Sequence, residues 1–168
     1  MSKNLFLVIF LLFSFKISSQ DVSIEIDISE QRLYLIEGLD IQASYAVSTS
    51  KYGEGSIENS FKTPLGYHVI KEKIGEGAKK NTIFKSRINT RRSADIIEEY
   101  HDSEDDFVTS RIMWLDGKEE GKNKGGSVDS FARYIYIHGT HEEGLIGTKA
   151  SHGCIRMFNT DAIELFDR

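Results

Sequence analysis

The sequence predicts a mainly β domain with one or two short helices. Two observations carry this prediction. Several segments alternate apolar and polar residues with the period of a half-buried strand, and strands do not alternate with long helices as a doubly wound parallel sheet requires. The chain has 168 residues, of which 39% are hydrophobic and 28% charged. These values fit one globular domain with a core of ordinary size.

The first twenty residues differ from the rest. Lys3 precedes an apolar run from Leu5 to Phe15, and small and polar residues follow that run as far as Gln20. This pattern is typical of a cleaved signal peptide, because the run has about half the ~20 residues of a membrane-spanning helix. An uncleaved anchor is the alternative. We therefore expect a signal peptide at residues 1–20, a domain at residues 21–168, and export to the periplasm or cell envelope.

Alternation predicts three consecutive strands near the start of the domain. Residues 22–29 read VSIEIDIS, with one valine and three isoleucines on one face and polar residues on the other. A short turn leads to residues 31–38, which predict a hairpin partner, and residues 41–49 predict a third strand. Residues 51–62 are rich in glycine and polar residues, so they predict a loop.

Further strands follow a turn at Pro64 and Gly66, where the only proline fixes φ and the glycine permits an unusual φ. Residues 107–117 and 132–140 predict two more strands, the second by the same alternation. Between them, residues 118–130 are polar and contain three glycines. They predict a long loop of the kind that serves as a lid or binding segment.

Two short helices are expected. Residues 93–100 predict one, capped by Ser93, and residues 160–167 predict another, capped by Asn159. The acidic run from Glu104 to Asp106 is most simply interpreted as a solvated edge.

The net charge of the chain limits the classes of molecule that its surface favours as binding partners. The chain carries 21 Lys and Arg against 26 Asp and Glu, and removing the signal peptide takes away Lys3 and Lys16 but no acid, so the net charge changes from −5 to −7. Such a surface does not favour nucleic acid or anionic lipid. We expect a monomer that contacts a membrane only through an uncleaved signal segment. Any anionic group of a substrate must meet a local cluster of Arg or Lys.

Cys154 is the only cysteine, within the stretch SHGCIRM that begins at Ser151. A single cysteine in an exported protein forms no internal disulfide, which leaves a buried thiol, an intermolecular bridge or a reactive nucleophile. A nucleophilic thiol needs a base or a positive environment, and donors for the oxyanion. His138 ends a predicted strand on which Tyr136 shares its face, and the sixteen residues from His138 to Cys154 allow the chain to return alongside it.

The neighbours of Cys154 could supply the remaining parts. Gly153 lets a carbonyl approach the backbone, where the N–H groups of Gly153 and Cys154 could face the oxyanion. Arg156 shares the face of Cys154 on an extended segment. It could favour the thiolate or hold a substrate carboxylate, and a structural ion pair is the alternative.

A zinc site is a weaker interpretation of the same segment. His138, His141, His152 and Cys154 are all metal-ligand types, but the odd spacing of His138 and His141 turns them to opposite faces of a strand. A thioredoxin-type redox role lacks the second cysteine of a C-x-x-C pair. We therefore expect no metal and no cofactor.

The motifs HGT at residues 138–140 and SHGCIRM resemble the signature of the L,D-transpeptidase catalytic domain of the YkuD type. The stretches IEIDISEQRLYLIEG, YAVSTSKYG, TPLGYHVI, RIMWLDG and the run from Arg133 to Asp167 resemble the same family. The resemblance covers most of Val22 to Asp167. It implies a mainly antiparallel β sandwich with a small helical part, and this family continues past the last helix into a further strand that the sequence does not contain.

The resemblance also implies roles for single residues. Cys154 would be the acyl-accepting nucleophile and His138 the base, oriented by the backbone carbonyl of Gly139. Gly153 and Cys154 would contribute the oxyanion N–H groups. The other implied substrate-site residues are Tyr136, Ser151, His152 and Arg156, of which Ser151 and His152 would shape the loop.

The implied reaction is acyl transfer on peptidoglycan stem peptides. The thiolate attacks the carbonyl of the third stem residue, the terminal D-alanine leaves, and an amine from another stem resolves the thioester. Two alternatives stay open. Water as the acceptor would make the protein an L,D-carboxypeptidase or amidase, and loss of catalysis would leave a wall-binding protein, although binding alone needs no thiol.

Overall fold

The computed structural model describes residues 21–168, so the expected signal peptide at residues 1–20 lies outside the described residues. The fold is mainly β with one short α-helix and two 3-10 turns. The elements in chain order are β1 (Val22–Asp27), β2 (Arg32–Glu37), β3 (Asp40–Ser48), β4 (His68–Ile74), β5 (Thr82–Lys85), β6 (Ile88–Ser93), β7 (Val108–Gly117), η1 (Gly126–Val128), β8 (Tyr136–Thr140), η2 (Glu143–Leu145), β9 (Ile155–Met157) and α1 (Asn159–Asp167).

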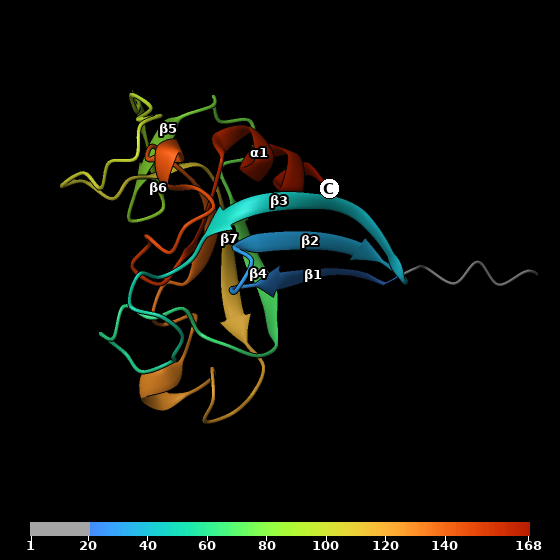
Figure 1. Cartoon of the computed structure of the whole chain (residues 1–168). Helices are drawn as coiled ribbons and strands as arrows, with labels where there is room; N and C mark the ends of the chain where they lie inside the picture. The colour runs from blue at the N-terminus through green and yellow to red at the C-terminus, as the bar shows by residue number, and fades with distance from the viewer. Residues whose placement is uncertain (1–20) are drawn as a thin grey trace, which may run out of the picture.

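The strands of this part of the chain form one nine-stranded sheet in the order β1-β2-β3-β9-β8-β7-β5-β6, with β4 paired to β7 off this path. All pairs are antiparallel except β8 and β9, which are parallel. In Figure 1, β1, β2 and β3 run together across the view, and β4 and β7 run down it. The prediction of a mainly β fold is confirmed. The sheet is mixed rather than wholly antiparallel, and a sandwich is not confirmed, because hydrogen bonds run through one continuous sheet.

The N-terminal hairpin matches the alternation of its sequence. β1 and β2 pair from Val22 opposite Glu37 to Asp27 opposite Arg32, and β3 then pairs with β2. The carboxylate of Asp27 accepts the backbone N–H of Ser29 at 2.8 Å and closes the turn. The three strands predicted at the start of the domain are therefore present in the expected order.

Two apolar clusters lie on opposite faces of the central strands. Ile137 of β8 and Ile155 of β9 belong to the larger cluster, against which α1 packs. Tyr136 belongs to the smaller one, where Cys154 packs at the edge. The alternation of β8 and β9 thus separates the core face from the face that carries the thiol. The larger cluster contains Leu33, Leu35, Tyr45, Val47, Met113, Leu115, Ile135, Ile137, Ile155, Met157, Ala162, Leu165 and Phe166.

The helix predicted at residues 93–100 is wrong. Ser93 is the last residue of β6, and residues 94–107 form an extended segment without a helix. Ile97 donates its backbone N–H to His141 O at 2.8 Å and accepts the Gly144 N–H at 2.9 Å. Because these neighbours satisfy the main-chain groups, the segment needs no helical hydrogen bonds.

The helix predicted at residues 160–167 is confirmed, but Asn159 does not cap it through its side chain. The Asn159 amide is buried, donates to Thr140 O at 2.6 Å, and accepts from Thr109 Oγ1 at 2.6 Å. It therefore fastens α1 to β7 and β8. None of the helices in residues 21–168 has the length and apolar character needed to cross a membrane.

The loop predicted at residues 118–130 is present and includes the short turn η1. The buried amide of Asn123 donates to Leu65 O and Tyr67 O, both at 3.0 Å. These bonds fasten the loop to the turn that precedes β4. Its role as a lid stays a prediction.

Candidate active site

The parallel pairing of β8 and β9 brings the two halves of the sequence motif together. Ile137 lies opposite Ile155 and His138 opposite Arg156, so Cys154 comes beside Tyr136. The Tyr136 N–H lies 3.4 Å from the Cys154 Sγ. Since facing residues of paired strands project to the same side, the side chains of Tyr136, His138, Cys154 and Arg156 share one face of the sheet.

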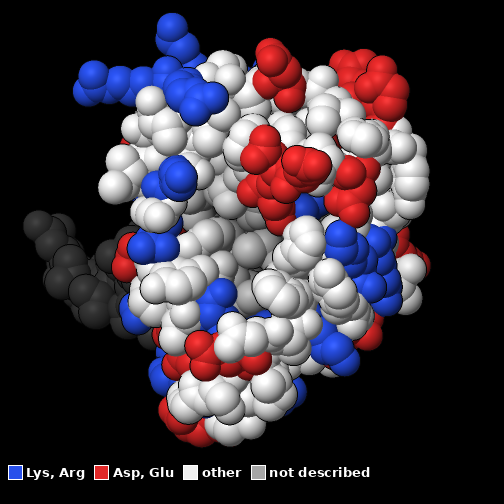
Figure 2. All heavy atoms as spheres, turned by 90° about the vertical axis from the view of Figure 1, so that its left-hand side faces the viewer, with Lys and Arg blue, Asp and Glu red and all other residues white. Residues whose placement is uncertain are grey.

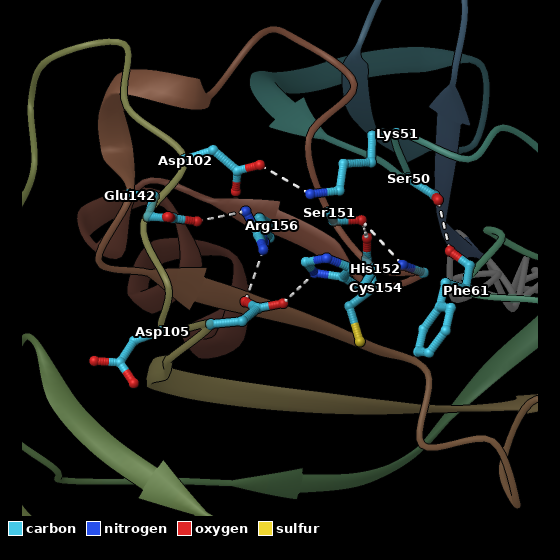
Figure 3. Close-up of polar contacts among 12 residues, drawn as sticks. Ser50, Lys51, Phe61, Asp102, Asp105, Glu142, Ser151, His152, Cys154 and Arg156 are labelled. Carbon is cyan, nitrogen blue, oxygen red and sulfur yellow. Dashed lines mark hydrogen bonds and ion pairs between the residues drawn. The ribbon is translucent and has the colours of Figure 1, made fainter. Parts of the chain in front are cut away.

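The Cys154 thiol is partly exposed and lies against the backbone that leads into β8. Its S–H donates to Tyr134 O at 3.5 Å. Figure 3 shows the sulfur directed away from the ion pair of Lys51 and Asp102. Burial raises the pKa of the thiol to about 12, against the lowering effect of the Tyr136 N–H. The resting thiol is therefore protonated at neutral pH.

His138 is 2% exposed and holds its ring in one orientation. Its Nδ1 lies 2.7 Å from Gly139 O, and because a carbonyl only accepts, Nδ1 carries the proton and Nε2 keeps its lone pair. Burial lowers the pKa of His138 to about 4. Within the described residues no hydrogen bond joins His138 to Cys154, so the resting site holds a neutral imidazole and a neutral thiol on one face.

Ser151 and Gly153 shape the loop that presents Cys154. The Ser151 hydroxyl donates to Cys154 O at 2.6 Å and accepts the Gly153 N–H at 3.2 Å. Gly153 has a φ of +119°, and a Cβ there would lie 3.3 Å from Lys62 O, so this position favours glycine. The Gly153 N–H is thus engaged inside the loop rather than facing a substrate, contrary to what the sequence led us to expect.

Arg156 is 1% exposed and paired with two carboxylates. Its Nη1 lies 2.9 Å from Glu142 Oε2 and its Nη2 lies 2.8 Å from Asp106 Oδ1. Figure 3 shows the guanidinium of Arg156 and its contact with Glu142. The arrangement is the structural ion pair that we considered as the alternative, and it leaves the guanidinium buried away from any substrate carboxylate.

The acidic run from Glu104 to Asp106 is exposed, as predicted for a solvated edge, but Asp106 also has a structural role that the prediction lacked. Its Oδ2 lies 2.9 Å from His152 Nδ1, so one carboxylate connects Arg156 to His152. Burial alone would raise the pKa of Asp106, but the charge of Arg156, together with hydrogen bonds from Arg156 and His152, lowers it to about 2. Asp106 is therefore a carboxylate that fixes the His152 ring, and no local pattern in the sequence indicated this role.

The extended segment 94–107 lies over this carboxylate cluster. Lys51 and Asp102 form an ion pair at 2.8 Å, and the Ser103 N–H donates to Glu142 Oε1 at 2.5 Å. Figure 3 shows the Lys51–Asp102 and Glu142–Arg156 contacts beside the thiol loop. The segment thereby bounds the site on the side of Arg156.

Aromatic rings form another rim of the site. The His152 ring lies 5.9 Å from that of Tyr52 and 6.1 Å from that of Phe61, measured between centroids. Phe61 is 53% exposed and has a φ of +57°, which is unusual for a bulky residue. Ser50 Oγ donates to Phe61 O at 2.6 Å and fixes this conformation, as Figure 3 shows.

Charges of both signs surround this side of the molecule. The 51–62 loop, the 94–107 segment and the chain from 141 to 154 all lie on the left in Figure 1. Figure 2 turns that side toward the viewer, with acidic side chains gathered above a central hollow and basic side chains on both flanks. This side of the molecule therefore presents both signs of charge around the hollow.

Other features lie apart from the thiol. In residues 21–168 no three His, Cys, Asp or Glu side chains are arranged to hold a metal, and His141 faces Ser103 and Phe107. A cavity of about 610 Å³ lies between β1 and the start of β4, and Ile137 and Ile155 are among its lining residues. These two isoleucines project to the face opposite Cys154, so this cavity is not part of the site.

Comparison with known proteins identifies the family. A family model described as the YkuD L,D-transpeptidase catalytic domain matches residues 21–168. The chain therefore belongs to the YkuD family of L,D-transpeptidase catalytic domains. L,D-transpeptidases are generally exported cell-wall enzymes that act on peptidoglycan peptides. No curated protein matched the sequence.

Solved structures show a similar fold at low sequence identity. LdtMt1, an L,D-transpeptidase in complex with imipenem, has 16% identity and a TM-score of 0.50 over 88% of this chain and 54% of its own. An L,D-transpeptidase from Mycobacterium smegmatis has 18% identity and a TM-score of 0.49 over 88% and 54%. L,D-transpeptidase 3 from Mycobacterium tuberculosis, with a faropenem-derived adduct, has 16% identity and a TM-score of 0.44 over 87% and 55%. The chain thus spans about half the length of these proteins.

Proposed function

We propose that the protein is a peptidoglycan L,D-transpeptidase with Cys154 as nucleophile and His138 as base. The observation that carries this proposal is the β8–β9 register, which turns both side chains to one face of the sheet. A second support is the His138 tautomer, because its Nε2 lone pair can accept a proton. Membership of the YkuD family supplies the substrate class.

The first half of the reaction forms a thioester. When a donor stem binds, the sulfur leaves Tyr134 O and approaches Nε2 of His138, a contact that tightens in the substrate complex. The proton passes to Nε2 as Sγ attacks the carbonyl carbon of the third stem residue. The C–N bond then breaks, and the imidazolium returns the proton to the departing amine of the terminal D-alanine.

Burial lowers the pKa of His138, whereas the hydrogen bond to Gly139 O and the carboxylate of Asp106 raise it and so favour the imidazolium that forms. The guanidinium of Arg156 acts in the opposite direction to Asp106. The Cys154 N–H would stabilise the oxyanion, since the Gly153 N–H is engaged with Ser151. Tyr136 would position the stem through its ring beside the thiol.

The second half transfers the acyl group to an amine. An amine of another stem attacks the thioester carbonyl and passes one proton to His138 Nε2. The C–S bond breaks and the thiolate takes that proton, which restores the resting site. No ATP is consumed, because the thioester retains the energy of the broken peptide bond, and this suits an exported enzyme. We infer that residues 1–20 are the signal peptide that directs this export.

Incubation with a disaccharide-tetrapeptide, with and without an added amine acceptor, tests the proposal. We expect release of D-alanine together with a cross-linked dimer, and neither product from Cys154→Ser. Release of D-alanine without a dimer at high acceptor concentration would make the protein a carboxypeptidase. Binding of the stem with no release of D-alanine would make it a wall-binding protein.

A further inference from the structure

Arg133 is a half-buried cation with no acidic partner. Its Nη2 donates to Lys62 O at 2.7 Å, and its Nη1 lies 3.5 Å from Gly55 O. Among residues 21–168, no Asp or Glu lies within ion-pair distance of this guanidinium. A charge that loses part of its hydration without a counter-charge is costly, so such a group is often completed by an anionic ligand.

The guanidinium lies beside the thiol loop. Arg133 directly precedes Tyr134, whose carbonyl contacts the Cys154 sulfur. The carbonyl of Lys62 that Arg133 binds is the same atom that a Cβ at Gly153 would approach to 3.3 Å. Arg133 therefore spans from the backbone under the sulfur to the loop beside Gly153. Burial lowers the pKa of Arg133, while a thiolate at Cys154, once formed, and the more distant carboxylate of Glu58 would raise it, which agrees with the proximity of Arg133 to the thiol.

Two other buried arginines serve different purposes. Arg156, which the sequence indicated as the carboxylate ligand, is neutralised by two acids. Arg111 also lacks an acidic partner in the described residues, but it donates to Ala78 O and Ser110 O and stacks on Phe166. Arg87 is half-buried near the thiol, but it donates to Tyr136 Oη and lies over the Trp114 and Tyr134 rings. Arg133 instead binds the carbonyl of Lys62 beside Gly153 and has no acid within ion-pair distance in the described residues.

We propose that Arg133 binds the terminal carboxylate of the donor stem, an inference that rests on the function proposed above. In the donor, this carboxylate belongs to the residue that leaves, so it lies about one residue length, roughly 3.5 Å, from the carbonyl that the sulfur attacks. Arginine suits a carboxylate because its planar fork offers parallel N–H donors. The donors that face Lys62 O and Gly55 O leave other N–H groups of the fork for the ligand.

Paired peptide substrates test this inference. A tetrapeptide stem with a free terminal carboxylate is compared with the same stem ending in D-alaninamide, and kcat/KM is measured from release of D-alanine or its amide. We expect the wild-type protein to prefer the acid by about 10- to 100-fold, the range of a charge-assisted hydrogen bond. Arg133→Gln should lower kcat/KM for the acid substrate by that factor and leave kcat/KM for the amide substrate unchanged. The preference for the acid would then be lost. Arg133→Lys should retain part of it.

The controls separate binding from structure. Arg92→Gln removes an exposed arginine and should leave the preference unchanged. Alkylation of Cys154 by iodoacetamide, which is uncharged, reports whether Arg133→Gln keeps the thiol loop intact. If Arg133→Gln lowered kcat/KM equally for both peptides, or if the wild-type protein had no preference for the acid, the role of Arg133 would be overturned. The proposed function would not be affected by either result. Failure of the wild-type protein to release either leaving group would instead contradict the proposed function, and the inference with it.

Discussion

Replacing Arg156 with methionine tests whether this residue stabilises the fold or binds substrate. The change removes a guanidinium that is 1% exposed and leaves Glu142, also 1% exposed, as a buried carboxylate without its main partner. Breaking one side of a buried ion pair costs about 3–5 kcal/mol. A domain of this size has about 5–15 kcal/mol of stability, so Arg156→Met should lose a large share of it.

Urea unfolding followed by tryptophan fluorescence measures this loss, because Trp114 is the only tryptophan and is buried. The double variant Arg156→Met/Glu142→Gln removes the stranded charge and should recover part of the stability. Arg92→Met makes the same chemical change on the surface and serves as the control. A loss below about 1 kcal/mol in Arg156→Met, with a large rise in KM for the donor, would refute the structural role.

Three further predictions concern protonation and packing. Burial lowers the pKa of His138 from 6.5 to about 4, so the unfolded chain takes up this proton at a higher pH than the folded protein does. The free energy of unfolding should therefore fall by about 3 kcal/mol between pH 7 and pH 4. The variant His138→Gln should lose much of this pH dependence. If the wild-type protein and His138→Gln showed the same dependence of unfolding free energy on pH, this prediction would be contradicted. Because burial raises the pKa of Cys154 to about 12, alkylation by iodoacetamide without substrate should keep rising above pH 9, whereas a plateau near pH 7 would indicate a resting thiolate. Gly139→Ala would place a Cβ 2.6 Å from Asn159 Oδ1 and should lower the unfolding free energy by about 1–3 kcal/mol in the urea assay; an unchanged midpoint would contradict this packing.

Alternation in the sequence was sufficient for the first three strands and for the end of β8, and α1 follows its own period. β7 is buried along nearly its whole length, so it was predicted without alternation. The hairpin of β5 and β6 was missed because β6 is largely exposed and shows no alternation. Residues 93–100 looked helical by local signals, but their backbone groups bond to the chain near His141 and Gly144, which no local pattern encodes.

The residues of the site likewise fall into those that local sequence patterns predict and those that depend on long-range contacts. Cys154, His138 and Gly139 could be placed from motif and spacing, because a strand end and a following loop determine their positions. The partners of Arg156 could not, since Asp106 lies in a charge run typical of a solvated surface and reaches Arg156 only through the path of the 94–107 segment. Arg133 was missed for a related reason. Its lack of an acidic partner depends on contacts with a loop about seventy residues away in the sequence.

The mass of the intact protein after mixing with a carbapenem tests the central claim most directly, because it reports attack by the sulfur itself. We expect one adduct on the wild-type protein, none on Cys154→Ser, and formation slowed at least about 100-fold in His138→Gln, as loss of a general base predicts. An unmodified wild-type protein that is demonstrably folded, or equal rates with and without the imidazole, would contradict an acyl-accepting thiol served by His138.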